Sequence, residues 1–93
     1  MPDVSRTVVV GSRVGLHSRP AKLVAQEAAK LAVAVKISKN DGAAVDARSL
    51  LSILALGAKK GDQVTLFAEG EGADGAIQAL AVLIEQDLDE ADA

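Results

Sequence analysis

Residues 18–39 read SRPAKLVAQEAAKLAVAVKISK, and the hydrophobic period changes within this stretch. Up to Leu31 the apolar side chains recur at steps of three and four residues, which predicts an amphipathic helix. From residue 33 onward they alternate with other residues, which predicts a strand with one apolar face. Pro20 fits only in the first turn of a helix, so this helix begins within a residue or two of His17. The stretch therefore predicts a helix followed directly by a strand.

The flanking sequence extends this order in both directions. Asn40-Asp41-Gly42 predicts a hairpin, and Gly57 is a typical end for a short apolar helix that Ser49 would cap. The predicted elements are a strand over 4–10, a helix over 18–31, strands over 33–39 and near 44–46, a helix over 50–56, a strand around 64–68 and a helix over about 73–88. This βαββαβα order predicts an α+β fold, an open-faced β-sandwich of four strands with all three helices on one face. Phe67 is out of step with the apolar residues of its strand and should lie on the open face.

The composition limits the chemistry that the chain can perform. Its 93 residues are 49% hydrophobic, which we interpret as one domain over residues 1–93. Without cysteine there is no disulfide or thiolate site, and with a single histidine there is no His-His zinc site. Tyrosine and tryptophan are absent, so a row of bases has nothing to stack on. We therefore expect no metal, no cofactor and no nucleic-acid partner.

The charge of the chain is unevenly distributed. The net charge is −3, but the segment from Glu85 onward holds five acidic and no basic residues, so the rest of the chain is slightly basic. We expect a solvated acidic tail at about 89–93 and a body that meets acidic partners. No uncharged run is long enough for a membrane helix, and Met-Pro-Asp is not the start of a signal peptide. These features predict a soluble cytoplasmic protein.

Residues 70–75, GEGADG, match the G-x-G-x-x-G pattern of dinucleotide-binding turns. Three acidic side chains, Glu69, Glu71 and Asp74, would face the pyrophosphate, and the loop carries no basic residue. Too few residues follow Gly75 for the second parallel strand that such a fold requires. We therefore interpret this segment as a glycine-rich turn at the start of a helix.

His17 stands at the predicted start of a helix, where backbone N–H groups and the helix dipole favour an anion. The same dipole disfavours an imidazolium, so the ring, whose ordinary pKa is about 6.5, should be neutral and nucleophilic near neutral pH. Arg19 adds a permanent cation with forked donors suited to phosphate. Gly15-Leu16 lets the chain turn sharply into the site. The residues predict a phosphohistidine site that carries a phosphoryl group rather than processing a substrate.

Two motifs carry a family resemblance. Gly15-Leu16-His17-Ser18-Arg19-Pro20-Ala21 resembles the active-site motif of the HPr family, the histidine-containing phosphocarriers of the bacterial phosphoenolpyruvate:sugar phosphotransferase system. Residues 47–57, ARSLLSILALG, resemble the regulatory-serine helix of the same family. The similarity covers about residues 3–88. It implies the open-faced sandwich predicted above, with an antiparallel sheet.

The resemblance also implies a reaction and partners. In HPr-like proteins, enzyme I transfers a phosphoryl group from phosphoenolpyruvate to Nδ1 of the active-site histidine, here His17, which passes it to the enzyme IIA unit of a sugar permease. The amides of Ser18 and Arg19 and the Arg19 guanidinium can stabilise the charge that develops during transfer. We expect a monomer, because one face must meet two partners in turn.

The same resemblance implies roles for residues near the second motif. The family's docking patch maps onto Leu50, Leu51 and Leu54, with Leu16 a possible addition. Three leucines so close together on a short helix cannot all face the core. Ser49 is an N-cap by its position, and in some HPr-like proteins a dedicated kinase phosphorylates this serine and lowers the affinity for partners.

Some positions depart from the family pattern, and alternatives remain open. Ser18 stands where alanine or threonine is more common, Ser52 stands where glycine is common, and the hairpin around 40–42 is one residue longer. The last two weaken the expectation of a serine kinase. The chain could instead serve the nitrogen-related phosphotransferase branch, which shares the histidine motif. It could also be a non-catalytic regulatory or ligand-binding module in which His17 has no chemical role.

Overall fold

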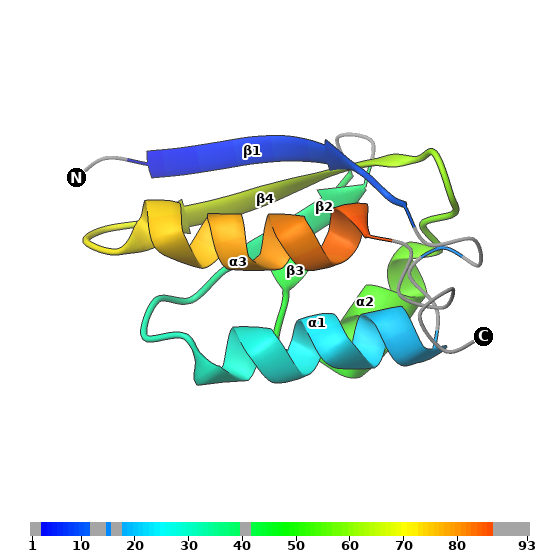
Figure 1. The fold of residues 1–93 in the computed structure, drawn as a ribbon, viewed down its shortest axis with the longest axis horizontal. Helices are drawn as coiled ribbons and strands as arrows, with labels where there is room; N and C mark the ends of the chain where they lie inside the picture. The colour runs from blue at the N-terminus through cyan, green and yellow to red at the C-terminus, as the bar shows by residue number, and fades with distance from the viewer. Residues whose placement is uncertain (1–2, 12–14, 16–17, 40–41, 87–93) are drawn as a thin grey trace.

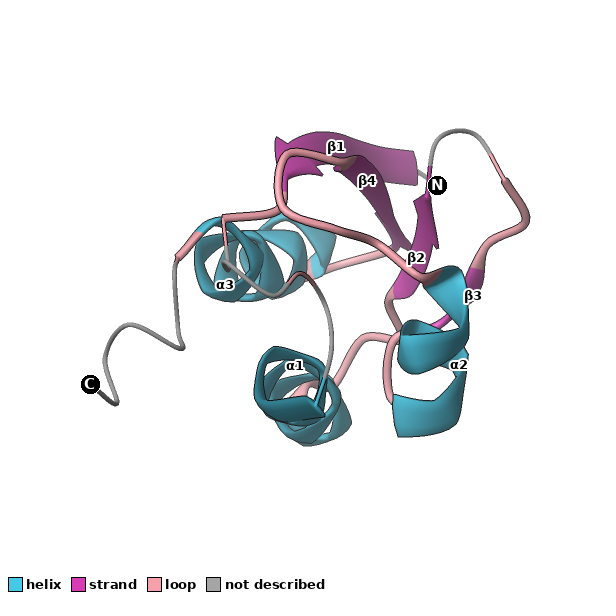
Figure 2. Cartoon of the chain, turned by 90° about the vertical axis from the view of Figure 1, so that its right-hand side faces the viewer, coloured by secondary structure: helices cyan, strands magenta, loops and turns pink. Residues whose placement is uncertain are grey.

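A computed structural model describes residues 3–11, 15, 18–39 and 42–86. The elements, in order, are β1 (Asp3–Val9), α1 (Ser18–Lys30), β2 (Lys36–Lys39), β3 (Val45–Asp46), α2 (Leu50–Leu56), β4 (Gln63–Glu69) and α3 (Ala73–Glu85). The four strands form one sheet in the order β1-β4-β2-β3, and every neighbouring pair is antiparallel. The three helices lie on one face of this sheet (Figures 1 and 2). The predicted α+β open-faced sandwich is confirmed.

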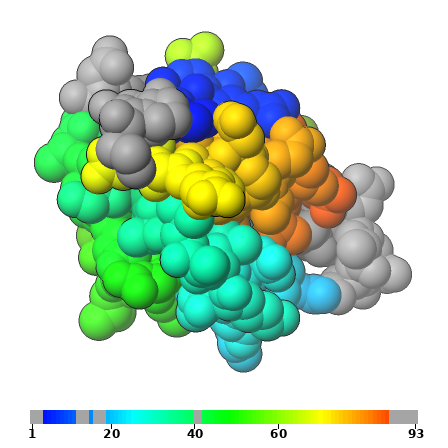
Figure 3. All heavy atoms as spheres, turned by 90° about the vertical axis from the view of Figure 1, so that its left-hand side faces the viewer, coloured from blue at the N-terminus to red at the C-terminus, as the bar shows by residue number. Residues whose placement is uncertain are grey.

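The predicted strand over 33–39 is too long, because β2 begins only at Lys36. Val35 is buried all the same, and its carbonyl accepts a hydrogen bond from the Ala47 amide at 3.0 Å. Val33 lies against the start of α3, with its Cγ2 3.4 Å from the position that a Cβ on Gly72 would take. In Figure 3 the segment after α1 lies directly beside this start of α3. The alternation of Val33 and Val35 therefore reflects which side chains pack inward, although the strand itself begins only at Lys36.

The other elements match their predicted ranges to within a few residues. α1 ends at Lys30 and not at Leu31, β3 starts at Val45, and α3 ends at Glu85. Asn40 and Asp41 of the predicted hairpin, and Leu88 with the acidic tail, lie outside the described residues.

The ends of α2 are set by the two residues predicted for them. The Ser52 amide donates to the Ser49 Oγ at 3.2 Å, which satisfies one of the N–H groups that the helix itself leaves unpaired. At the other end Gly57 takes a left-handed conformation with φ +64°, and its N–H donates to the Leu54 carbonyl. The helix is only seven residues long, so these two caps largely determine where it begins and ends.

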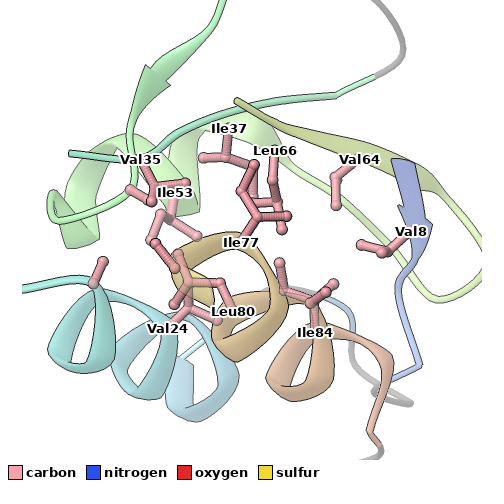
Figure 4. Close-up of a cluster of buried hydrophobic side chains, with 14 of the residues drawn as sticks. Val8, Val24, Val35, Ile37, Ile53, Val64, Leu66, Ile77, Leu80 and Ile84 are labelled. Carbon is pink, nitrogen blue, oxygen red and sulfur yellow. The ribbon is translucent and has the colours of Figure 1, made fainter. Parts of the chain in front are cut away.

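An aliphatic core fills the space between the sheet and the helices (Figure 4). Its largest fully buried members include Ile37, Leu66, Ile77, Leu80 and Ile84. Burying an aliphatic side chain of this size contributes about 1.5–3 kcal/mol. Phe67 lies outside this core, 39% exposed on the open face of the sheet, as its register predicts.

No helix in the described part of the chain is both long enough and apolar enough to cross a membrane.

Candidate functional site

The predicted phosphohistidine, His17, and its neighbour Leu16 lie outside the described residues. The residues on either side of them, Gly15 and Ser18, are described. α1 begins at Ser18, so His17 directly precedes a helix in the chain, as the position of Pro20 predicts. Pro20 itself is fully buried in the first turn.

The first turn of α1 has the electrostatic character of an anion site. Among the residues of α1, the first turn contains no acidic side chain, and Arg19 is exposed there. The N–H groups of a first turn have no carbonyl partner within their helix, and the helix dipole places partial positive charge at this end. An exposed guanidinium on the same turn adds a full charge. This end of α1 can therefore stabilise a phosphoryl group on a neighbouring residue.

Gly15 fixes where the chain enters the site. It is buried and has φ +76°, a backbone conformation that glycine adopts without strain. A Cβ at this position would lie 2.3 Å from the Ala58 carbonyl oxygen and 2.8 Å from the Lys59 Cα. Only a residue without a side chain fits against this backbone. Gly15 thus packs directly on the turn that follows α2.

A groove between α1 and α2 extends from the first turn of α1. Its volume is about 550 Å³, and it is lined by Arg19, Lys22, Leu23, Gln26, Leu50 and Leu54. Arg19, Leu50 and Leu54 are site residues predicted from the sequence, and the structure brings these three together. Lys22, Leu23 and Gln26 were not predicted. Their spacing from Arg19 places them on one face of the helix and could have identified them.

The three leucines do not all face the core, as predicted, and none of them is fully buried. Leu51 is 80% exposed and Leu50 38% exposed, whereas Leu54 is half-buried beside the groove. Ile53 is the residue of α2 that enters the core, with no exposed surface. α2 therefore presents an apolar surface toward solvent next to the basic residues of α1.

Two carboxylates near α2 are held by backbone amides and cations. Asp46 accepts from the Arg48 amide at 2.9 Å and pairs with the Arg48 guanidinium, and the hydrogen bonds from Arg48 lower the pKa of this carboxyl. Asp62 accepts from the Lys59 amide at 2.8 Å, and this bond lowers the pKa of Asp62, with Lys39 adding a smaller effect. Both carboxylates close turns next to α2, one before it and one after it.

The glycine-rich segment 70–75 is a turn into α3, as predicted. Gly70 and Gly72 have φ values of +94° and +89°, and Gly72 is the residue that precedes the first turn of α3. The strand before it, β4, pairs antiparallel with both neighbours, so this is not the parallel unit of a dinucleotide-binding fold.

Comparisons with known proteins agree with this geometry. The family model of the phosphotransferase-system HPr component phosphorylation site matches residues 4–86. The phosphocarrier protein HPr of Streptomyces coelicolor is 42% identical over 85 residues, which cover 91% of each chain. The crystal structure of a phosphocarrier protein HPr from Bacillus anthracis is similar with a TM-score of 0.84 and 36% identity, covering 90% of this chain and 99% of that one. An HPr dimer from Thermoanaerobacter tengcongensis is similar with a TM-score of 0.66 and 39% identity, over 91% of this chain and 94% of that one.

Proposed function

Because the chain belongs to the HPr family of phosphotransferase-system phosphocarriers, we propose that it accepts a phosphoryl group on His17 from phospho-enzyme I and passes it to enzyme IIA units of sugar permeases. A protein of this family carries the group and is not itself the catalyst. The observation that supports the proposal most directly is the start of α1 at Ser18, with Arg19 exposed and no acid in the first turn.

The transfer step uses a neutral imidazole. The lone pair on Nδ1 of His17 attacks phosphorus in line with the bond to the donor's histidine nitrogen, and that P–N bond breaks with its electron pair returning to the donor ring. The amides of Ser18 and Arg19 and the Arg19 guanidinium stabilise the charge on the equatorial oxygens. In the second step the acceptor of enzyme IIA attacks phosphorus, and the P–N bond to His17 breaks with its electron pair returning to the imidazole ring. We place both steps in the cytoplasm.

Intact mass measurement tests this step. Incubating the full chain with phosphoenolpyruvate, Mg²⁺ and enzyme I should add one phosphate that is labile to acid and stable to base. His17→Ala should abolish the addition, and Arg19→Glu should slow it far more than it lowers thermal stability. A phosphorylated His17→Ala variant, or a wild-type chain that never accepts phosphate, would disprove the proposal. In the latter case a non-catalytic module becomes the better description.

We assign the α1–α2 groove and the exposed Leu51 to partner docking, and we propose the same role for Leu16, which lies outside the described residues. Apolar side chains and two cations, Arg19 and Lys22, line this groove. Such a lining suits a partner surface that has acidic groups around an apolar centre. Lys22→Glu should raise the KM for enzyme I by about 5-fold or more, because it places like charges opposite each other. Lys30→Glu, at the exposed far end of the same helix, is the matched control and should leave this KM unchanged.

Ser49 is the proposed site for a regulatory serine kinase. Its Oγ caps α2 next to the exposed Leu50, so a phosphate there would suit the helix N-terminus while placing negative charge beside the docking groove. Ser49→Asp retains a capping oxygen, so it should weaken enzyme I binding at unchanged thermal stability. Equal binding by the wild type and this variant would contradict a regulatory role.

The sugar branch and the monomeric state are part of the same proposal. The resemblance of residues 47–57 to the regulatory-serine helix supports the sugar branch over the nitrogen-related branch. Phosphorylation assays with the enzyme I of each branch should show faster transfer from the sugar-branch enzyme. Sedimentation of the full chain should give the mass of one copy, whereas a dimer would show that this chain assembles like the relative from Thermoanaerobacter tengcongensis.

A further inference from the structure

Val10 and Gly15, which precede His17 in the chain, both contact one turn, residues 58–62. At the start of the segment, the Val10 amide donates to the Asp62 carbonyl at 2.9 Å, and the Val10 carbonyl accepts from the Gly61 amide at 3.0 Å. At its other end Gly15 lies directly against the backbone of Ala58 and Lys59. The positions of Val10 and Gly15 therefore both depend on the conformation of the 58–62 turn.

Asp62 holds this turn in shape through its side chain. Its Oδ2 accepts the Lys59 amide at 2.8 Å, and its own amide donates to the Lys59 carbonyl at 2.9 Å. Lys39 Nζ lies 3.5 Å from the same Oδ2 and donates to the Gly57 carbonyl at 3.2 Å, which ties the turn to the end of α2. Asp62 thus contacts Val10 directly, through its carbonyl, and it acts on Gly15 through Lys59.

We infer that Asp62 is a positioning residue for His17, because its carboxylate fixes Lys59, against which Gly15 packs two residues before the histidine. This inference rests on the proposed phosphoryl acceptance by His17. In-line transfer tolerates little displacement of the attacking nitrogen, since a shift of about 1 Å can cost up to about 100-fold in rate. Loosening the 58–62 turn should therefore slow the chemical step while leaving the α1–α2 groove intact.

Two substitutions separate the hydrogen bond from the charge. Asp62→Asn removes the charge but keeps an oxygen that can accept the Lys59 amide, whereas Asp62→Ala removes both. Asp46→Ala is the matched control, because Asp46 also accepts a backbone amide and pairs with a cation, but it closes the turn before α2. Each variant is first checked for folding by circular dichroism.

The assay is the rate of phosphorylation by enzyme I, resolved into kcat and KM. We expect Asp62→Ala to lower kcat by about 10-fold with little change in KM, and Asp62→Asn and Asp46→Ala to stay within about 2-fold of the wild type. If Asp62→Ala keeps the wild-type kcat while folded, or if Asp62→Asn is as slow as Asp62→Ala, the positioning role is refuted.

A second readout does not depend on phosphoryl transfer. The chain has one histidine, so the imidazole resonances in an NMR titration belong to His17 without further assignment. We expect the imidazole titration in Asp62→Ala to differ from that in Asp62→Asn, because only Asp62→Asn keeps an acceptor for the Lys59 amide. Identical titrations in the two variants would overturn the inference. If the wild type accepts no phosphate, the proposed function fails, and this titration still tests the position of the ring.

Discussion

Replacing Gly15 by alanine adds a methyl group where the structure leaves no room for one. The new Cβ would lie 2.3 Å from the Ala58 carbonyl oxygen, so the backbone on one side must move. A non-glycine residue at φ +76° also bears about 1–2 kcal/mol of conformational strain. Crowding in a packed region adds about 1–3 kcal/mol. The less flexible unfolded chain of the variant offsets about 0.4–1 kcal/mol of this loss. We therefore expect a net loss of about 1–5 kcal/mol in the free energy of unfolding.

Gly57→Ala is the control for the strain alone. Gly57 has a similar φ of +64°, but a Cβ there would have nothing within 4 Å. We expect Gly57→Ala to lose about 1.5 kcal/mol or less, because the strain remains and the crowding does not. Thermal unfolding followed by far-ultraviolet circular dichroism compares the two variants. At about 4–8 °C per kcal/mol for a domain of this size, Gly15→Ala should unfold at least about 4 °C below Gly57→Ala.

The same variant should be impaired in phosphate acceptance at a temperature where it remains folded, because the displaced backbone precedes His17 by two residues. Equal unfolding temperatures for Gly15→Ala and Gly57→Ala would refute the reasoning. They would mean that Gly15 does not lie against the turn after α2 and that only its φ matters.

Three further predictions concern α2 and the two turns beside it. Ser49→Ala should cost about 1 kcal/mol by removing the cap of α2; an unchanged unfolding temperature would show that the hydroxyl caps nothing. Leu51→Glu should change the free energy of unfolding by no more than about 0.5 kcal/mol, since Leu51 is 80% exposed, but it should raise the KM for enzyme I. Ile53→Ala should instead lower the free energy of unfolding by about 2–5 kcal/mol, because Ile53 is fully buried. The folded-state pKa values of Asp46 and Asp62 lie below their unfolded values, so their stabilising contribution is complete above the unfolded pKa, about 3.9, and is lost as the pH falls through the folded values. Unfolding temperatures measured below about pH 4 should therefore fall less steeply in an Asp46→Asn/Asp62→Asn double variant, and parallel curves would contradict the assigned hydrogen bonds.

The elements with strong local signals could be predicted closely from the sequence. α2 matches its predicted range because a capping serine and a terminal glycine define both ends without help from the rest of the fold. The exposure of Phe67 followed from its register alone. The predicted strand over 33–39 was too long for a physical reason. Alternation indicates which side chains are buried, but not whether a neighbouring strand is available for pairing. Val33 and Val35 are apolar because they pack on the core beyond the end of the ladder.

The surroundings of the candidate site were less accessible to sequence reasoning. The motif identified the start of α1, because proline and the helical period are local signals. The contact between Gly15 and Lys59 joins positions far apart in the chain, and nothing in either local sequence indicates it. The same holds for Asp62, which reads locally as an ordinary turn residue. Its hydrogen bond to Lys59 could have been predicted, but not its relation to the segment before His17.

The position of β4 has a consequence for how the protein is made. β4 is the sixth of seven elements in the chain, yet it lies between β1 and β2 and pairs with both. During synthesis β1 therefore has no neighbour in the sheet until most of the chain has left the ribosome, and only the short β2–β3 pair can form before that. Pairing at such long sequence separation slows folding. We expect the nascent chain to stay largely unfolded until β4 has been synthesised. The sheet then forms in one late step, in which β4 pairs with both β1 and β2.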